Sequence, residues 1–214
     1  MRDEFVRAFD EAFETAALDA ADLTSCYARA RSWTQFMLGE QPRGVLRLAV
    51  DLWAKMCGYD APGACSPHAQ WYTLDLCVVA PAYAGDGDYW KSRTVLALEH
   101  ENDSDVETEM WKLAHWRAEL SVLVFCDFSE AERRTAAPAG DRWLKGVTKP
   151  DWLEKKLERL SAIVKAVDGR SAERHLLVIG EKSVGDPATL QWRASVWDGA
   201  GFAEPCPIKD AWAR

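Results

Sequence analysis

Two glutamates at the end of an apolar run are the residues of this chain best suited to chemistry. The run from Thr94 to Asn102 has the composition of a buried β-strand, and Glu99 and Glu101 stand two positions apart in it. Because side chains alternate across a strand, both should lie on one face, roughly 6–7 Å apart along the chain. Two like charges placed there raise each other's pKa and resist burial. A divalent cation such as Mg²⁺ would remove this conflict, since it binds hard oxygen ligands.

A third acid lies in the preceding predicted strand, Trp71–Val79, which carries Asp75 in its middle. We expect Asp75 and Glu99 to lie on neighbouring strands with their side chains on the same face. Together with Glu101 they would form an acidic centre for Mg²⁺ or Mn²⁺. Two other interpretations stay open: Asp75 could belong to a half-exposed face of its strand, and the two glutamates could lie at a solvent-exposed strand end.

The helix that follows Glu101 supplies a cation. Its predicted core stripe consists of Val106, Met110, Leu113 and Leu120, and Lys112 lies on the opposite stripe. Lys112 could stabilise charge that develops at the acidic centre. The favoured interpretation is that it pairs with Glu109 one turn away, as ordinary surface residues of a helix do. His100 should point away from both glutamates, and His115 should lie on the surface.

The elements that must position these residues follow from hydrophobic periodicity. We predict helices over 3–20, 24–38, 46–56, 106–120 and 151–167, and strands over 71–79, 94–101, 121–128, 175–180 and 190–197. The first two strands suit an antiparallel hairpin, and the step through the helix to 121–128 suits a right-handed parallel crossover. The fold class is therefore α/β, a mixed β-sheet flanked by helices on both faces. We divide the chain into an N-terminal helical segment (1–42) and an α/β domain (43–214).

Between residues 43 and 128 this pattern resembles the PD-(D/E)XK nuclease superfamily. That resemblance implies a restriction-endonuclease-like core of αβββαβ type, in which an Asp and the first Glu of the next strand bind Mg²⁺ and a Lys two positions later helps to activate water. The matching positions here are Asp75, Glu99 and Glu101, so a Glu stands where the family usually has Lys. Some members carry Glu-x-Glu, and in others the Lys moves to the following helix, where Lys112 could serve.

The resemblance implies a Mg²⁺-dependent endonuclease that hydrolyses phosphodiester bonds, with DNA as the expected substrate and Asp75, Glu99, Glu101 and Lys112 as catalytic residues. A homodimer would suit cleavage of both strands. The alternative is a catalytically inactive nuclease-fold protein that acts as a binding or interaction module, which the missing Lys after Glu99 and the net charge of −8 favour. A third hypothesis is a metal-dependent hydrolase of small phosphorylated molecules.

Composition limits the remaining possibilities. A chain of 214 residues with 48% hydrophobic residues can bury one sizeable core. No apolar run reaches the roughly 18 residues needed to span a bilayer, and the N-terminus lacks the features of a signal peptide, so we expect a cytoplasmic protein without membrane contact. In that compartment the six cysteines are expected to be small buried hydrophobes.

Bases and tryptophans are concentrated in ways that bear on nucleic-acid binding. Residues 133–174 carry eleven bases and six acids, an arrangement that suits a polyanionic partner or a solvated helix of mixed charge. Of the eleven tryptophans, we expect three to fill the core: Trp53, Trp71 and Trp111. Four others lie in or beyond the basic segment: Trp143, Trp152, Trp192 and Trp197. Core packing is the default expectation for most of these rings, but an exposed ring there could stack on a base.

Overall fold

The computed structural model describes residues 1–19, 23, 26, 29–40, 43–60, 66–71, 73–81, 92–102, 105–140, 144–168, 174–181 and 190–211. The helices are α1 (Arg2–Asp19), α3 (Ala30–Leu38), α4 (Val45–Met56), α5 (Val106–His115), α6 (Glu130–Arg133), α7 (Trp152–Asp168) and α8 (Ile208–Ala211). The strands are β1 (Ser66–Trp71), β2 (Leu74–Ala80), β3 (Arg93–Glu101), β4 (Leu120–Asp127), β5 (His175–Glu181), β6 (Arg193–Val196) and β7 (Cys206–Pro207). In this part of the chain no helix is long and apolar enough to cross a membrane.

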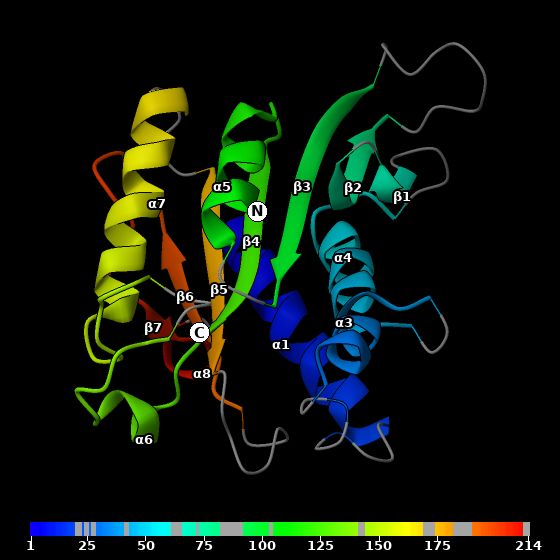
Figure 1. Ribbon diagram of the computed structural model, residues 1–214. Coiled ribbons are helices and arrows are strands. Elements are labelled where there is room, and N and C mark those ends of the chain that lie inside the picture. The colour runs from blue at the N-terminus through cyan, green and yellow to red at the C-terminus, as the bar shows by residue number, and fades with distance from the viewer. Residues whose placement is uncertain are drawn as a thin grey trace.

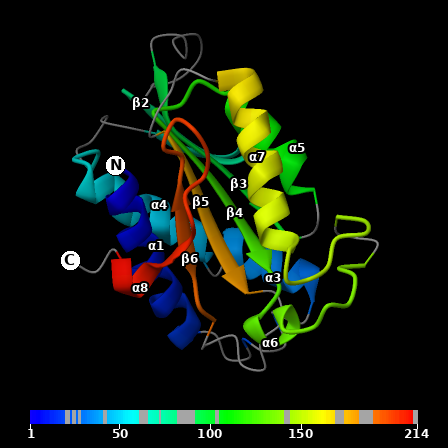
Figure 2. The same cartoon turned by 90° about the vertical axis from the view of Figure 1, so that its left-hand side faces the viewer.

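The strands form one mixed sheet in which sequence order and spatial order are the same, from β1 to β7 (Figure 1). Strands β3, β4 and β5 run parallel to one another, while β2 is antiparallel to both β1 and β3, and β6 is antiparallel to β5. Helix α5 connects β3 to β4, and α7 precedes β5. Seen edge-on, the sheet has α5 and α7 on one face and α1 and α4 on the other (Figure 2). This is the mixed sheet flanked by helices that the sequence predicts.

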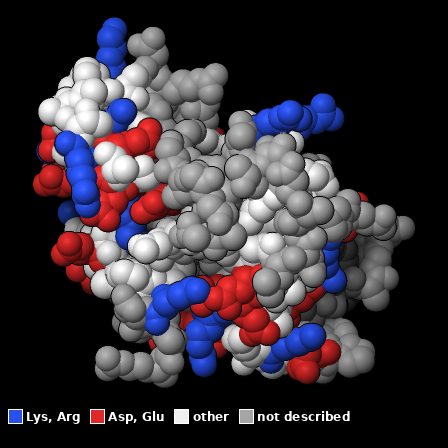
Figure 3. Space-filling view, turned by 90° about the horizontal axis from the view of Figure 1, so that it is seen from below, with Lys and Arg blue, Asp and Glu red and all other residues white. Residues whose placement is uncertain are grey.

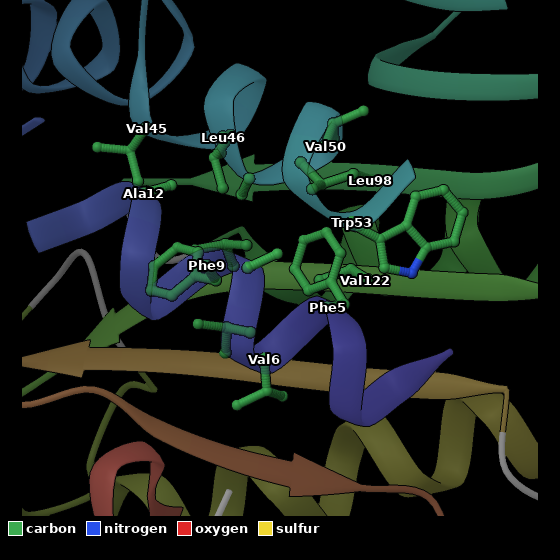
Figure 4. Close-up of a cluster of buried hydrophobic side chains, with 14 of the residues drawn as sticks. Phe5, Val6, Phe9, Ala12, Val45, Leu46, Val50, Trp53, Leu98 and Val122 are labelled. Carbon is green, nitrogen blue, oxygen red and sulfur yellow. The ribbon is translucent and has the colours of Figure 1, made fainter. Parts of the chain in front are cut away.

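Helices α1 and α4 cover one face because their apolar residues recur at helical spacing. Phe5 and Phe9 are four residues apart in α1 and are fully buried, as is Trp53 of α4. Figure 4 shows these side chains between the two helices and the strands that carry Leu98 and Val122. The predicted N-terminal segment therefore contributes a helix to the same core as the sheet.

Helices α5 and α7 cover the opposite face through a second apolar cluster. Met110 and Leu113 of α5, Leu160 of α7 and Phe125 of β4 are all fully buried in it. The two helices are also joined by an ion pair between Lys156 Nζ and Glu107 Oε2 at 2.7 Å, in which the lysine side chain is only 1% exposed. Because the lysine is buried, separating this pair would cost free energy, so the pair helps to hold α5 in place over the sheet.

The structure corrects several element predictions. The predicted strand over 71–79 is two strands, β1 ending at Trp71 and β2 beginning at Leu74, with a turn at Thr73 between them. The helices α6 and α8 and the strand β7 were not predicted, because elements of two to four residues are too short to show a periodicity. The helix predicted from residue 24 is described only in part, and α3 begins at Ala30.

The helix after β3 is shorter than predicted. It ends at His115, and Trp116 has extended backbone angles, φ −84° and ψ 123°. The carbonyl of Trp116 accepts from Nη2 of Arg174 at 2.9 Å. Leu120, which was expected on the core stripe of the helix, is instead the first residue of β4 and is buried there.

The tryptophan predictions are partly wrong. Trp53 is buried as expected, but Trp111 is 53% exposed on the outer side of α5. Trp152, Trp192 and Trp197 are buried, so none of these three rings is free to stack on a base. The side chains of Trp71 and Trp143 lie outside the described residues.

Of the cysteines, Cys77 and Cys126 are buried, Cys206 is exposed, and Cys65 lies outside the described residues.

Candidate active site

Asp75 and Glu99 meet where the β2–β3 hairpin begins to separate. The two strands are antiparallel neighbours, and the last pair in register toward this end is Leu76 with Leu98. Asp75 and Glu99 are the next residues along each strand. Cys77 and Ala97, each two positions back along its strand, belong to the apolar cluster under α5 and α7. By strand alternation Asp75 and Glu99 lie on that same face.

Each carboxylate binds the backbone of the opposite strand. The backbone N–H of Asp75 donates to Oε2 of Glu99 at 3.3 Å, and the backbone N–H of His100 donates to Oδ2 of Asp75 at 2.9 Å. The two acids therefore extend the contact between β2 and β3 beyond the regular backbone ladder. This arrangement fixes both side chains relative to the sheet, which is a requirement for a site whose groups must be held in place before a ligand arrives.

Lys112 of α5 reaches the same point from above the sheet. Its Nζ lies 2.9 Å from Oε1 of Glu99, contacts Oε2 of Glu109 and donates to the backbone carbonyl of Thr73 at 3.3 Å. The expected pair of Lys112 with Glu109 along the helix is therefore present, and Lys112 also pairs with the acid of β3. Glu109 is 15% exposed in its side chain and was not among the predicted site residues.

Burial gives Glu99 unusual electrostatics. Its side chain is 2% exposed. Burial, together with the nearby charges of Asp75 and Glu109, raises the pKa of Glu99 to about 8, although Lys112 acts in the opposite direction. Although burial lowers the pKa of Lys112, its bonds to Glu109 and Glu99 raise it above the ordinary value. A carboxyl group with a pKa near neutrality, held beside a second acid and a lysine, is the kind of group found at functional sites more often than elsewhere.

The other predicted residues lie around this centre. Glu101 is the last residue of β3, is half-buried, and by alternation lies on the same face as Glu99. His100 points to the opposite face and is buried, and burial lowers its pKa to about 4. His115 is exposed, with its ring 4.2 Å from that of Trp111 between centroids.

The donor set can be compared with what a hard cation needs. Within the described ranges, no group of three or more His, Cys, Asp or Glu side chains is placed to hold a metal ion. However, Mg²⁺ is commonly held by one or two carboxylates and completes its octahedron with water and substrate phosphate. Asp75 and Glu99 offer such a pair. Oε1 of Glu99 is buried, and its close partner is the Lys112 ammonium. In number and in chemistry, these residues fit a two-carboxylate site.

Comparison with known proteins adds no identification. No protein-family model, curated protein or solved structure matches this chain. The function of the protein must therefore be inferred from its residues and their geometry.

A second charged cluster lies at the carboxyl end of the neighbouring strands. Asp127 ends β4, is fully buried, and accepts from Arg193 Nη2 of β6 at 2.8 Å and from the backbone N–H of Phe128 at 2.7 Å. Arg133 of α6 lies 3.7 Å away through Nη1. Burial raises the pKa of Asp127, while the two arginines lower it. The sequence shows the acid at the end of an apolar run, but it gives no sign of its partners.

The basic segment is largely engaged in ion pairs. Lys155 pairs with Glu158, Arg159 approaches Glu107, and Arg134 pairs with Glu130. Figure 3 looks onto the end of the molecule where β3, β4 and β5 finish, and acidic and basic side chains of the described residues are interspersed there. In the described residues these bases belong to paired, solvated faces, which agrees with the plainer of the two interpretations of the segment.

Proposed function

We propose that this protein is a Mg²⁺- or Mn²⁺-dependent nuclease of the PD-(D/E)XK type, with DNA as its substrate. The observation that carries the proposal is the meeting of Asp75, Glu99 and Lys112 at one point from β2, β3 and α5. In the resembling family, two acids on neighbouring strands and one lysine have these positions.

The order of elements supports this proposal. Helix α4, strands β1 to β3, helix α5 and strand β4 follow one another as αβββαβ, the order expected from the resemblance. The strand β1, which the sequence did not reveal, supplies the third strand of that order. The acids lie on the second and third strands, and Lys112 lies on the crossover helix. In this proposal Lys112 does the work of the family's lysine, because Glu101 stands at the position where the family usually has that lysine.

Each residue has a chemical part in such a reaction. Asp75 and Glu99 would hold the cation, which would neutralise charge on the scissile phosphate and lower the pKa of the attacking water. Lys112, within 2.9 Å of Glu99, can donate to a phosphate oxygen or to that water as charge develops. Glu101, one step further along the same face of β3, can orient the water.

The test is cleavage of plasmid and of single-stranded DNA with Mg²⁺, with Mn²⁺ and with chelator. Wild type should cleave only with metal. Asp75→Asn and Glu99→Gln should lose activity and metal binding, whereas Lys112→Gln should bind metal and lose about 10²–10³-fold in rate, as removal of one charge-stabilising donor does. Glu119→Gln is the matched control, since Glu119 pairs with Arg93 instead. Cleavage that persists in chelator, or in Glu99→Gln, would rule out this site.

A second candidate is a binding module that keeps the fold without catalysis. It is favoured by the internal pairing of Glu99 with Lys112, which leaves the acid neutralised without any metal. The same experiment separates the two candidates. Binding of DNA without cleavage, equal in Mg²⁺ and in chelator, would support the module, and retention of that binding by Glu99→Gln would confirm that the acid serves only the fold.

A further inference from the structure

One ammonium group serves two carboxylates at the candidate site. Lys112 Nζ lies between Glu99 of β3 and Glu109 of its own helix, and Asp75 stands beside Glu99. Two acids thus contact one lysine, and a third acid lies beside one of them. Glu109 has no other ion pair in the described part of the chain.

A divalent cation at Asp75 and Glu99 would compete with this lysine. The ammonium is 2.9 Å from Oε1 of Glu99, which is hydrogen-bond distance. A second cation on the same carboxylate would lie within a few ångströms of the first, where like charges repel strongly in a partly buried site. We therefore expect the ammonium to move away from Oε1 of Glu99 when a cation binds there.

Glu109 offers the place to which the lysine can withdraw. It precedes Lys112 by three residues, so both side chains leave α5 on the same side, and the contact between them exists already. The helix itself need not move. Val106, Met110 and Leu113 anchor it in the core, and Glu107 ties it to Lys156 of α7.

We propose that Lys112 is the resident counter-ion of the acid pair and that Glu109 is a positioning residue, which retains the ammonium when a divalent cation takes over Glu99. This inference rests on the proposed metal site. If the inference holds, Glu109 affects metal affinity only by holding Lys112, and Glu109 does not contact the metal.

The experiment is a double-mutant cycle on metal binding, with Mn²⁺ alone and no nucleic acid, measured by calorimetry. The proteins are wild type, Glu109→Gln, Lys112→Gln and the double variant, with Glu119→Gln as the control. We expect Glu109→Gln to bind Mn²⁺ about tenfold more weakly and Lys112→Gln about tenfold more tightly, and the double variant to match Lys112→Gln within about twofold. Melting in chelator shows that each protein is folded.

Three results would overturn the inference. If removing Glu109 weakens binding equally with and without Lys112, then Glu109 is itself a ligand. If removing Glu109 does not change Mn²⁺ affinity either with or without Lys112, then the pair between Glu109 and Lys112 only stabilises the surface of α5. If wild type binds no Mn²⁺, the metal site and the inference fail together. Metal binding with the expected cycle but without DNA cleavage would instead overturn the nuclease and leave this inference standing.

A further variant keeps the test decisive if Lys112→Gln does not fold. Glu109→Asp preserves the charge on a side chain one methylene shorter. It should restore most of the Mn²⁺ affinity that Glu109→Gln loses. Equal losses in the Asp and Gln variants would show that the carboxylate charge is not what matters, and would overturn the role assigned to Glu109.

Discussion

Replacing Glu99 by Gln tests the electrostatics of the site in the absence of any metal. Burial raises the pKa of Glu99 from the ordinary value of 4.5 to about 8. A folded-state pKa above the unfolded one means that the folded protein holds the proton more tightly. This contribution to stability is complete below about pH 4.5 and is lost as the pH rises through about 8. Because one pKa unit corresponds to about 1.4 kcal/mol, the loss amounts to at most about 5 kcal/mol.

Glutamine resembles the protonated acid and cannot ionise, so Glu99→Gln should escape this loss. Urea unfolding in metal-free buffer at pH 5, 7 and 9 gives the free energy of unfolding of both proteins. The difference between them should grow in favour of Glu99→Gln as the pH rises, while Glu119→Gln should follow wild type throughout. A difference that stays constant from pH 5 to pH 9 would refute the reasoning, because it would mean that the buried acid does not take up a proton on folding.

Three further predictions concern the surroundings of the site. Burial lowers the pKa of His100 to about 4, so the folded state loses stability as the pH falls from 6.5 through 4; His100→Leu should remove that loss in acid melting curves. Gly180→Ala should destabilise the fold by about 1–3 kcal/mol in urea, because the added Cβ would lie 2.7 Å from the Trp192 ring, and an unchanged midpoint would contradict this packing. Arg193→Met should cost about 3 kcal/mol, since it removes the closest charged partner of the buried Asp127, and the matching double variant with Asp127→Asn should recover part of that loss.

The parts of the fold that sequence could predict are those with a repeating local signal. The hairpin of β2 and β3, the helix α5 and the crossover to β4 all follow from apolar periodicity. The first strand β1 gave no such signal, since the stretch Ser66-Pro67-His68 resembles a loop in composition. Trp111 was wrongly expected in the core. It follows Met110 directly, and one step of about 100° around a helix turns it away from the buried stripe.

The candidate site was predictable in part. Asp75 and Glu99 could be placed together because a hairpin brings neighbouring strands into contact. Glu109 could not, since a glutamate three residues before a lysine is an ordinary helical pair, and its approach to Glu99 depends on how α5 lies over β3. The partners of Asp127 come from α6 and β6, and no local pattern connects them.

The aromatic contact between α1 and β6 has a consequence for the newly made chain. Phe9 and Phe13 of α1 pack edge-on against Trp192, with ring centroids 4.8 and 5.4 Å apart. On the order of 180 residues separate these partners, so the contact forms only after nearly all of the sheet has been synthesised, and long loops of this kind close slowly. Until then the part of the apolar stripe of α1 that faces Trp192 stays uncovered. We expect chaperones that recognise such stripes to bind it during translation and to leave once β6 has joined the sheet.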